Sequence, residues 1–132
     1  MRRTLYLFIL FCTFHLANGQ ITKKVYYRRG HNYSTIYSYF VTELILSSDS
    51  TFVTNYYKVP IKKKWKNYKN SEPLKKEGQI SKKNKFYTLT ELIDGKKTDR
   101  IDYVKITNQK VTFYLVDKEG KFEKVYTMKQ KL

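Results

Sequence analysis

Short runs of β-branched and aromatic residues, each followed by a group of turn-forming residues, recur along most of the chain. No window places apolar residues at the i, i+3, i+4 and i+7 positions that an amphipathic helix requires. The pattern is therefore that of a chain built from strands. It predicts seven or eight of them, at residues 21–28, 37–46, 51–58, 77–81, 86–93, 100–107, 111–116 and 122–128.

The segments between these runs are short and have the composition of tight turns. Ser and Asp side chains at 47–50 can bond to their own backbone. Asp94 and Gly95 both tolerate a positive φ, which makes this pair the strongest hairpin signal in the chain. Such even spacing predicts an all-β fold, an antiparallel meander that forms a small barrel or sandwich. The chain after residue 19 is the length of one domain, 20–132.

Alternation along the strands predicts which side chains form the core. On the last strand, Phe122, Tyr126 and Met128 are expected on one side. The residues expected to be buried are Leu44, Leu46, Phe52, Leu89, Val111, Phe113 and Leu115.

Residues 1–19 have the layout of a secretory signal peptide. A basic start precedes an apolar run at 5–16, and the small residues Ala17 and Gly19 fit a cleavage before Gln20. The run is shorter than the roughly 20 residues that span a bilayer. We expect an exported protein, periplasmic or extracellular, with no transmembrane segment after cleavage.

The residues needed for common catalytic and metal chemistry are scarce. The only cysteine, Cys12, lies in the leader, and the one histidine outside it is His31. The strand carboxylates Glu43 and Glu91 have no partner that the sequence identifies. We therefore expect no disulfide, no metal site, no cofactor and no enzymatic activity.

The interval 59–76 departs from the strand pattern and is expected to be a basic surface loop, with at most one helical turn. Pro60 and Pro73 bracket it, and proline is confined to strand edges and bulges. The chain has 27 basic and 11 acidic residues, a formal net charge of +16. The candidate anion-binding residues of this loop are Lys62, Lys63, Lys64, Trp65, Lys66 and Lys69.

Lysine acts as a hydrated point charge, which favours general attraction of anions over specific readout. The partners expected for this loop are anionic lipid, acidic glycan or another envelope protein, while export disfavours nucleic acid. The alternative is that the lysines reflect composition and point into water, with Trp65 packed against the barrel as a lid.

A second aromatic and basic group lies near the start of the domain, and tyrosine is common in recognition surfaces. Ordinary half-buried strand tyrosines would give the same pattern. The residues of this candidate patch are Tyr26, Tyr27, Arg28, Arg29, Tyr37 and Tyr39.

Two sequence segments resemble the lipocalin-like small exported β-proteins of bacteria. The first is Leu44-Ile45-Leu46-Ser47-Ser48-Asp49-Ser50-Thr51-Phe52, with leucines leading into an Asp-centred turn and a Thr-Phe pair. The second is Glu77-Gly78-Gln79-Ile80 followed by Phe86-Tyr87-Thr88-Leu89. The resemblance covers residues 37–129. It implies a fold and an exported location but no activity.

These observations predict an exported, non-catalytic β-protein that acts as a binding or envelope-associated module with a basic surface. One alternative is a carrier whose barrel holds a small apolar ligand, as eight-stranded barrels can. Another is an inhibitor or immunity-type factor directed at one protein. The first alternative requires a cavity, whereas the others are compatible with a packed core.

Overall fold

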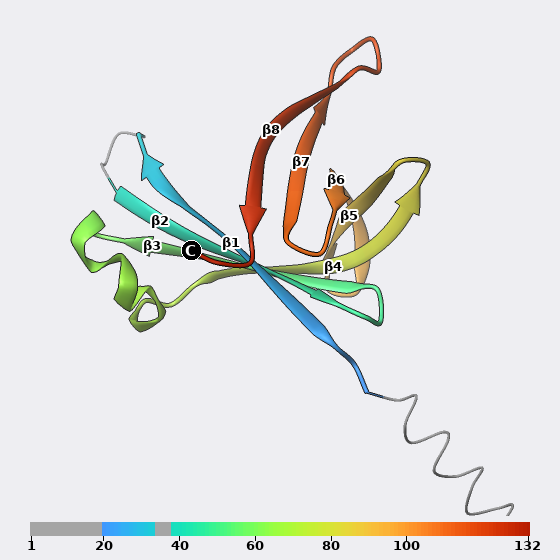
Figure 1. Ribbon diagram of the computed structural model, residues 1–132. Helices are drawn as coiled ribbons and strands as arrows, with labels where there is room; N and C mark the ends of the chain where they lie inside the picture. The colour runs from blue at the N-terminus through green and yellow to red at the C-terminus, as the bar shows by residue number, and fades with distance from the viewer. Residues whose placement is uncertain (1–19, 34–37) are drawn as a thin grey trace, which may run out of the picture.

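The chain forms a closed antiparallel β-barrel with one short helical segment on its outside (Figure 1). The structure is a computed structural model that describes residues 20–33 and 38–132, so the predicted leader and Tyr37 lie outside the described residues. Its elements are β1 (Lys23–Asn32), β2 (Ser38–Ser47), β3 (Thr51–Val59), the 3-10 helix η1 (Lys62–Asn70), β4 (Leu74–Lys83), β5 (Phe86–Ile93), β6 (Lys96–Ile106), β7 (Lys110–Val116) and β8 (Phe122–Lys129).

Every strand pairs with the next one along the chain, and β8 returns to β1. The predicted all-β meander is confirmed, and it closes as a barrel. The closure is short, because the register between β1 and β8 consists of Tyr27 opposite Lys129. By contrast, β1 and β2 pair along their whole length.

The hairpin predicted at Asp94 and Gly95 joins β5 to β6. Both residues have positive φ angles, 51° and 74°, and Ile93 lies opposite Lys96 across a two-residue turn. Two successive positive φ values define the mirror-image turn whose twist matches that of the flanking strands. The turn residues thus fix the register of this hairpin.

The main core lies inside the barrel, where alternate residues of each strand converge. Tyr26, Val104 and Met128 are almost fully buried there. Six of the seven predicted core residues are in this cluster: Leu44, Leu46, Phe52, Leu89, Val111 and Phe113.

The seventh core prediction, Leu115, is wrong. Its side chain is 66% exposed. The hairpin formed by β7 and β8 rises above the neighbouring strands in Figure 1, so the end of β7 has no opposite wall to pack against. A residue on the inward side of a strand is buried only where the barrel surrounds it.

The expectation for the last strand is corrected by a β-bulge. The pairing of β7 and β8 shifts between Phe113 and Tyr114, which leaves Val125 as an extra residue in β8. The extra residue reverses the alternation. Phe122 therefore packs on the outer side of the barrel, while Tyr126 lines the interior.

The segment 59–76 is more ordered than the predicted loop. Its middle forms η1, longer than the single turn expected, and β4 begins at Leu74, which pairs with Tyr56. The last three residues of the predicted loop are thus part of the barrel wall. Among the described residues, no helix is long and apolar enough to cross a membrane.

Gly78 allows β4 and β5 to approach closely. A Cβ at this position would lie 1.9 Å from the carbonyl oxygen of Thr90 and 2.7 Å from the ring of Phe52. Any side chain here would push apart the wall that supports Phe52, so glycine is required for packing.

Candidate ligand-binding cavity

A cavity of about 590 Å³ opens into the barrel, with lining residues from all eight strands. Small-molecule sites generally measure about 300–1,000 Å³. An eight-stranded barrel has an interior of the size that holds one small ligand. The position and volume of this cavity identify it as the candidate site.

The deep part of the cavity is apolar. Phe52, Leu89, Phe113 and Met128 line it, and all four belong to the buried core. Leu89 is 2% exposed and Met128 is 1% exposed, so these side chains are held by packing on their other sides. This floor offers an apolar ligand group a preformed surface.

Charged side chains also line this cavity, and they are here called the charged wall. Three cationic side chains, Arg28, Lys76 and Arg100, line it together with the carboxylates Glu91 and Asp102. Each lies on the inward side of its strand, in the same alternation that points core residues inward. The wall therefore has an excess of positive charge above an apolar floor.

Arg28 is held by aromatic rings. Its guanidinium carbon lies 3.9 Å from the centre of the Tyr126 ring and 5.4 Å from that of Phe40. Within residues 20–33 and 38–132, no carboxylate forms an ion pair with Arg28. Its guanidinium is thus held by the two rings and by a hydrogen bond with the Tyr126 side chain, and no carboxylate pairs with it.

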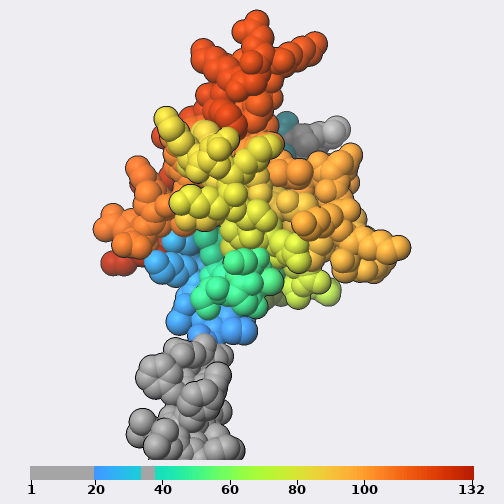
Figure 2. All heavy atoms as spheres, turned by 90° about the vertical axis from the view of Figure 1, so that its right-hand side faces the viewer, coloured from blue at the N-terminus to red at the C-terminus, as the bar shows by residue number. Residues whose placement is uncertain are grey.

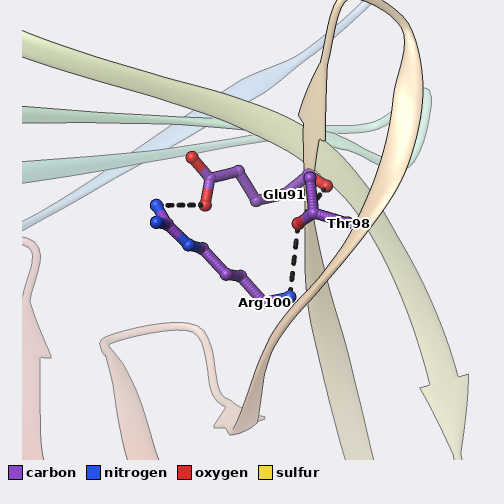
Figure 3. A network of polar contacts seen from close by, with 3 residues as sticks. All are labelled: Glu91, Thr98 and Arg100. Atoms are coloured by element: carbon purple, nitrogen blue, oxygen red, sulfur yellow. Dashed lines mark hydrogen bonds and ion pairs between the residues drawn. The ribbon is translucent and has the colours of Figure 1, made fainter.

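Arg100, in contrast, is paired. Its Nη1 lies 3.4 Å from Oε2 of Glu91, and Figure 3 shows the two side chains pointing toward one another. Thr98 links the backbones of the same two residues. Its hydroxyl donates to the Glu91 backbone carbonyl at 3.0 Å and accepts from the Arg100 backbone N–H at 3.2 Å. These bonds fix the two strands beside the turn that joins β5 to β6.

Asp102 and Tyr126 lie in the same electrostatic environment. Burial in the barrel wall raises the pKa of Asp102; nearby Lys76 opposes this shift and Glu91 adds to it. Burial also raises the pKa of Tyr126, with Asp102 adding to the shift and Arg28 opposing it. Lys76, Arg100 and Asp102 are exposed and Arg28 and Glu91 are half-buried, so solvent still screens much of this wall.

The far end of the barrel is closed by packing and one hydrogen bond. Tyr26 is completely buried, and its hydroxyl donates to the carbonyl of Thr107 at 3.0 Å. Burial raises the pKa of Tyr26. Tyr26 also lines a separate hollow of about 460 Å³ at this end of the barrel.

The lysines of the predicted basic loop are exposed, as the anion-binding hypothesis requires, but Trp65 does not accompany them. Its ring packs against the barrel, with the guanidinium carbon of Arg29 3.9 Å from the ring centre. This arrangement matches the alternative of a tryptophan lid. The exposed residues are Lys62, Lys63, Lys64, Lys66 and Lys69.

Below η1 lies a buried carboxylate on the outer side of β2. The Tyr68 hydroxyl donates to Oε1 of Glu43, and the Asn55 side-chain amide donates to Oε2 at 3.4 Å. Lys69 Nζ lies 3.7 Å from Oε1. Burial, followed by Glu43, raises the pKa of both Tyr57 and Tyr68. Glu43 thus fastens η1 to the barrel.

The candidate patch near the domain start is not brought together as one surface. Alternation along β1 places Tyr26 and Arg28 inside the barrel. Arg29 lies outside against η1, and Tyr39 is buried in the outer cluster beneath it. Tyr27 also alternates outward and is half-buried. Only Arg28 joins the cavity.

Sequence reasoning missed three charged cavity residues, Lys76, Arg100 and Asp102, and it named Glu91 only as a strand carboxylate. A signal existed for two of them, because Arg100 and Asp102 share the alternation of Val104, a residue of the core. Charged residues at inward positions of a barrel strand indicate a lined interior. The strand prediction did not assign Arg100 and Asp102 to the barrel interior.

The cavity lining combines apolar side chains with charged and hydroxyl-bearing ones. The described residues around the cavity include no histidine, cysteine or serine. In the described part of the chain, no group of three or more His, Cys, Asp or Glu side chains is placed to hold a metal ion. Apolar contact and charge pairing are the interactions that these side chains offer.

The fold and the cavity define a class of protein: a small antiparallel β-barrel with a ligand-sized, positively charged interior. Comparison with protein-family models, curated proteins and solved structures finds no match to this chain.

Proposed function

We propose that this protein is an exported, non-catalytic carrier that binds a small amphipathic molecule with an anionic group inside the barrel. The observation that carries the proposal is Arg28, a cation held by two rings above an apolar floor and without an ion-paired carboxylate among the described residues. Residues 1–19, interpreted as a signal peptide, support export.

The ligand class follows from the two parts of the cavity. The apolar part of the ligand would rest on Phe52, Leu89 and Phe113, where burial gains about 25 cal/mol per Å². Its anionic group would lie beside Arg28, with Lys76 adding positive potential. The charged wall extends the carrier hypothesis from purely apolar ligands to amphiphiles.

The outer surface supports a second interaction, with an anionic component of the cell envelope. The full chain has a formal net charge of +16, and only Arg2 and Arg3 of its basic residues lie in the interpreted signal peptide, so the exported domain keeps most of the charge that favours such an association. Anionic lipid and acidic glycan are the two candidates that the charge alone admits.

The carrier proposal is tested with a pair of ligands that differ only in charge. A medium-chain fatty acid and the alcohol of equal length are titrated against a fluorescent amphiphile bound to the protein. Arg28→Gln should weaken fatty-acid binding by about tenfold or more, since a hydrogen bond to a charged group contributes about 1.5–3 kcal/mol. Alcohol binding should change little.

Arg29→Gln is the matched control, because it removes the same charge from the adjacent residue on the outer side of the barrel. It should leave fatty-acid affinity unchanged. Failure of the wild type to bind either amphiphile would overturn the carrier proposal. Equal loss in both variants would show that Arg28 is not the recognising group.

A further inference from the structure

Four aromatic rings form a cluster on the outer side of β5 to β8, here called the aromatic face: Phe86, Tyr103, Tyr114 and Phe122. Phe86 and Phe122 stack with ring centres 4.0 Å apart and an interplanar angle of 14°. Tyr114 meets Phe86 edge-on at 5.1 Å, and Tyr103 meets Phe122 edge-on at 5.4 Å. The bulge at Val125 is what brings Phe122 into this cluster.

Exposed apolar side chains continue the aromatic face onto the projecting β7–β8 hairpin. Val116 is 40% exposed, Phe122 37% and Val125 49%, while Leu115, on the opposite, inward side of β7, is 66% exposed. Figure 2 shows this hairpin standing above the rest of the molecule, with the β4–β5 hairpin below it. Apolar groups gathered at such a projection mark a contact surface more often than a scattered distribution does.

A shallow hollow of about 480 Å³ connects the two hairpins. Val116, Gly120 and Phe122 line it from one side, and Lys83 at the end of β4 and Lys85 in the following turn line it from the other. The aromatic face is thus bordered by basic residues on the side of β4.

Lysines surround the apolar groups. Lys105 Nζ lies 5.1 Å from the centre of the Phe86 ring and 5.3 Å from that of Tyr114. Lys118, Lys121 and Lys124 are exposed on the β7–β8 hairpin. Its acidic residues are Asp117, Glu119 and Glu123; Asp117 accepts backbone N–H bonds from Glu119 and Lys121 and so serves the turn. On the hairpin the three lysines are matched by these three carboxylates, so the positive excess around the aromatic face comes from Lys83, Lys85 and Lys105.

The packing of the rings favours an anionic lipid layer over a nucleic acid or a glycan as the partner. One face of Phe86 lies against Phe122, and Lys105 lies over its ring as well. A nucleic-acid base or a sugar ring binds by stacking on a free aromatic face, and these mutual contacts leave little for it. An anionic lipid layer needs no free ring face, since it takes up exposed apolar side chains while lysines remain among the headgroups.

We propose that the aromatic face and the β7–β8 hairpin dock on an anionic phospholipid layer. This inference deepens the second, electrostatic part of the proposed function and does not depend on the cavity being filled. The same hairpin also supplies Phe113, Tyr126 and Met128 to the cavity. Docking would place one wall of the carrier site next to a source or destination of amphiphiles.

The test measures co-sedimentation of the protein with phosphatidylcholine vesicles that contain phosphatidylglycerol, and with vesicles of phosphatidylcholine alone. Changing Lys118, Lys121 and Lys124 to Gln should weaken binding to the anionic vesicles about a hundredfold, at roughly 1 kcal/mol per lysine near the surface. Leu115→Ser with Val116→Ser should weaken it about tenfold by removing apolar contact.

The matched control changes Lys62, Lys63 and Lys64 of η1 to Gln, an equal loss of charge on a different face. Vesicle affinity should fall far less than in the hairpin variant. Thermal unfolding of each variant verifies that the fold is retained.

Three outcomes overturn the inference. If the wild type binds no anionic vesicle, acidic polysaccharide or single-stranded DNA, the electrostatic part of the proposed function fails as well. If it binds and the η1 variant loses as much as the hairpin variant, the docking face is misplaced. If it binds polysaccharide or DNA as tightly as vesicles and the Leu115 and Val116 changes have no effect, the partner is a soluble polyanion.

Discussion

The barrel carries aromatic clusters on two parts of its outer surface, and only one is well covered. Over β2 and β3, the rings of Tyr39 and Tyr57 are 4% and 8% exposed, because Trp65 and Tyr68 of η1 pack on them. Over β5 to β8, Phe122 of the aromatic face is 37% exposed. Both regions combine aromatic residues with lysines in the sequence, yet their structural roles differ.

The covered region shows how a basic segment can be structural. Its contact with the barrel is made by Trp65, Tyr68 and the buried carboxylate of Glu43, while the lysines of η1 point outward. Lys69 pairs with Glu43, and Lys62, Lys63, Lys64 and Lys66 are exposed. On the aromatic face, lysines surround apolar groups that the chain itself leaves exposed. The two regions therefore differ in whether the chain itself buries their aromatic rings.

The largest expected effect compares one ring from each region. Tyr68→Ala should lower the free energy of unfolding by about 3–5 kcal/mol, as for other large buried aromatics, because it also removes a hydrogen bond to Glu43. Phe122→Ala should lower it by only about 1–2 kcal/mol, since its ring is partly exposed. Urea unfolding of both variants measures the difference. Similar losses would remove the distinction between a structural cover and an open face.

A smaller effect is expected when only the hydrogen bond between Tyr68 and Glu43 is removed. Tyr68→Phe keeps the ring and removes the donor to Glu43, which should lower the free energy of unfolding by about 1–3 kcal/mol at neutral pH. Denaturant unfolding at pH 7 provides the measurement. An unchanged midpoint would mean that Asn55 and Lys69 alone satisfy the carboxylate.

The same variant changes the response to alkaline pH. The pKa of Tyr68 is raised above its usual 10.0 by burial and by Glu43, so the folded state holds this proton more tightly than the unfolded state does. Above pH 10 the unfolded chain loses the proton first, and the free energy of unfolding falls as pH rises. Tyr57 and Tyr126, whose pKa values are also raised, share in this decline. Tyr68→Phe should make the decline less steep; an identical slope would contradict this assignment.

The sequence predicted the parts of this structure that depend on local pattern. Asp94 and Gly95 set a hairpin through their own backbone preferences, and Leu44 and Leu46 alternate inward as strand residues do. Leu115 was misplaced because burial there depends on where the barrel wall ends, which is a property of the whole fold. Phe122 was misplaced because a single extra residue at Val125 reverses the alternation.

The candidate site was predictable only in outline. Arg28 was identified with its neighbours as one patch, although alternation along β1 sends it inside and Arg29 outside. The partners of Arg28, the rings of Phe40 and Tyr126, come from strands at opposite ends of the chain. Strand alternation can place a residue inside a barrel, but the closure of β8 on β1 decides which residues it meets there.

A still smaller effect is expected from the ion pair at the edge of η1. Lys69→Gln should lower the free energy of unfolding by at most about 1 kcal/mol, because the lysine side chain is 69% exposed and solvent screens the pair. Lys64→Gln, an exposed residue of the same helix, is the control and should have no measurable effect. A loss of several kcal/mol from Lys69→Gln would mean that Lys69 contributes more than Tyr68 to holding η1 against Glu43.

The last prediction is the absence of a change. Trp65 is the only tryptophan in the chain, so its emission reports on η1 alone. Because Trp65 is packed under Arg29 and the proposed docking face lies on β5 to β8, anionic vesicles should bind without shifting that emission. In Phe122→Trp, a second indole on the aromatic face should add an emission component that shifts to the blue as the ring enters the lipid interface. A blue shift from Trp65 in the wild type would instead identify the lysines of η1 as the anion-binding surface and require the tryptophan to leave its packed position.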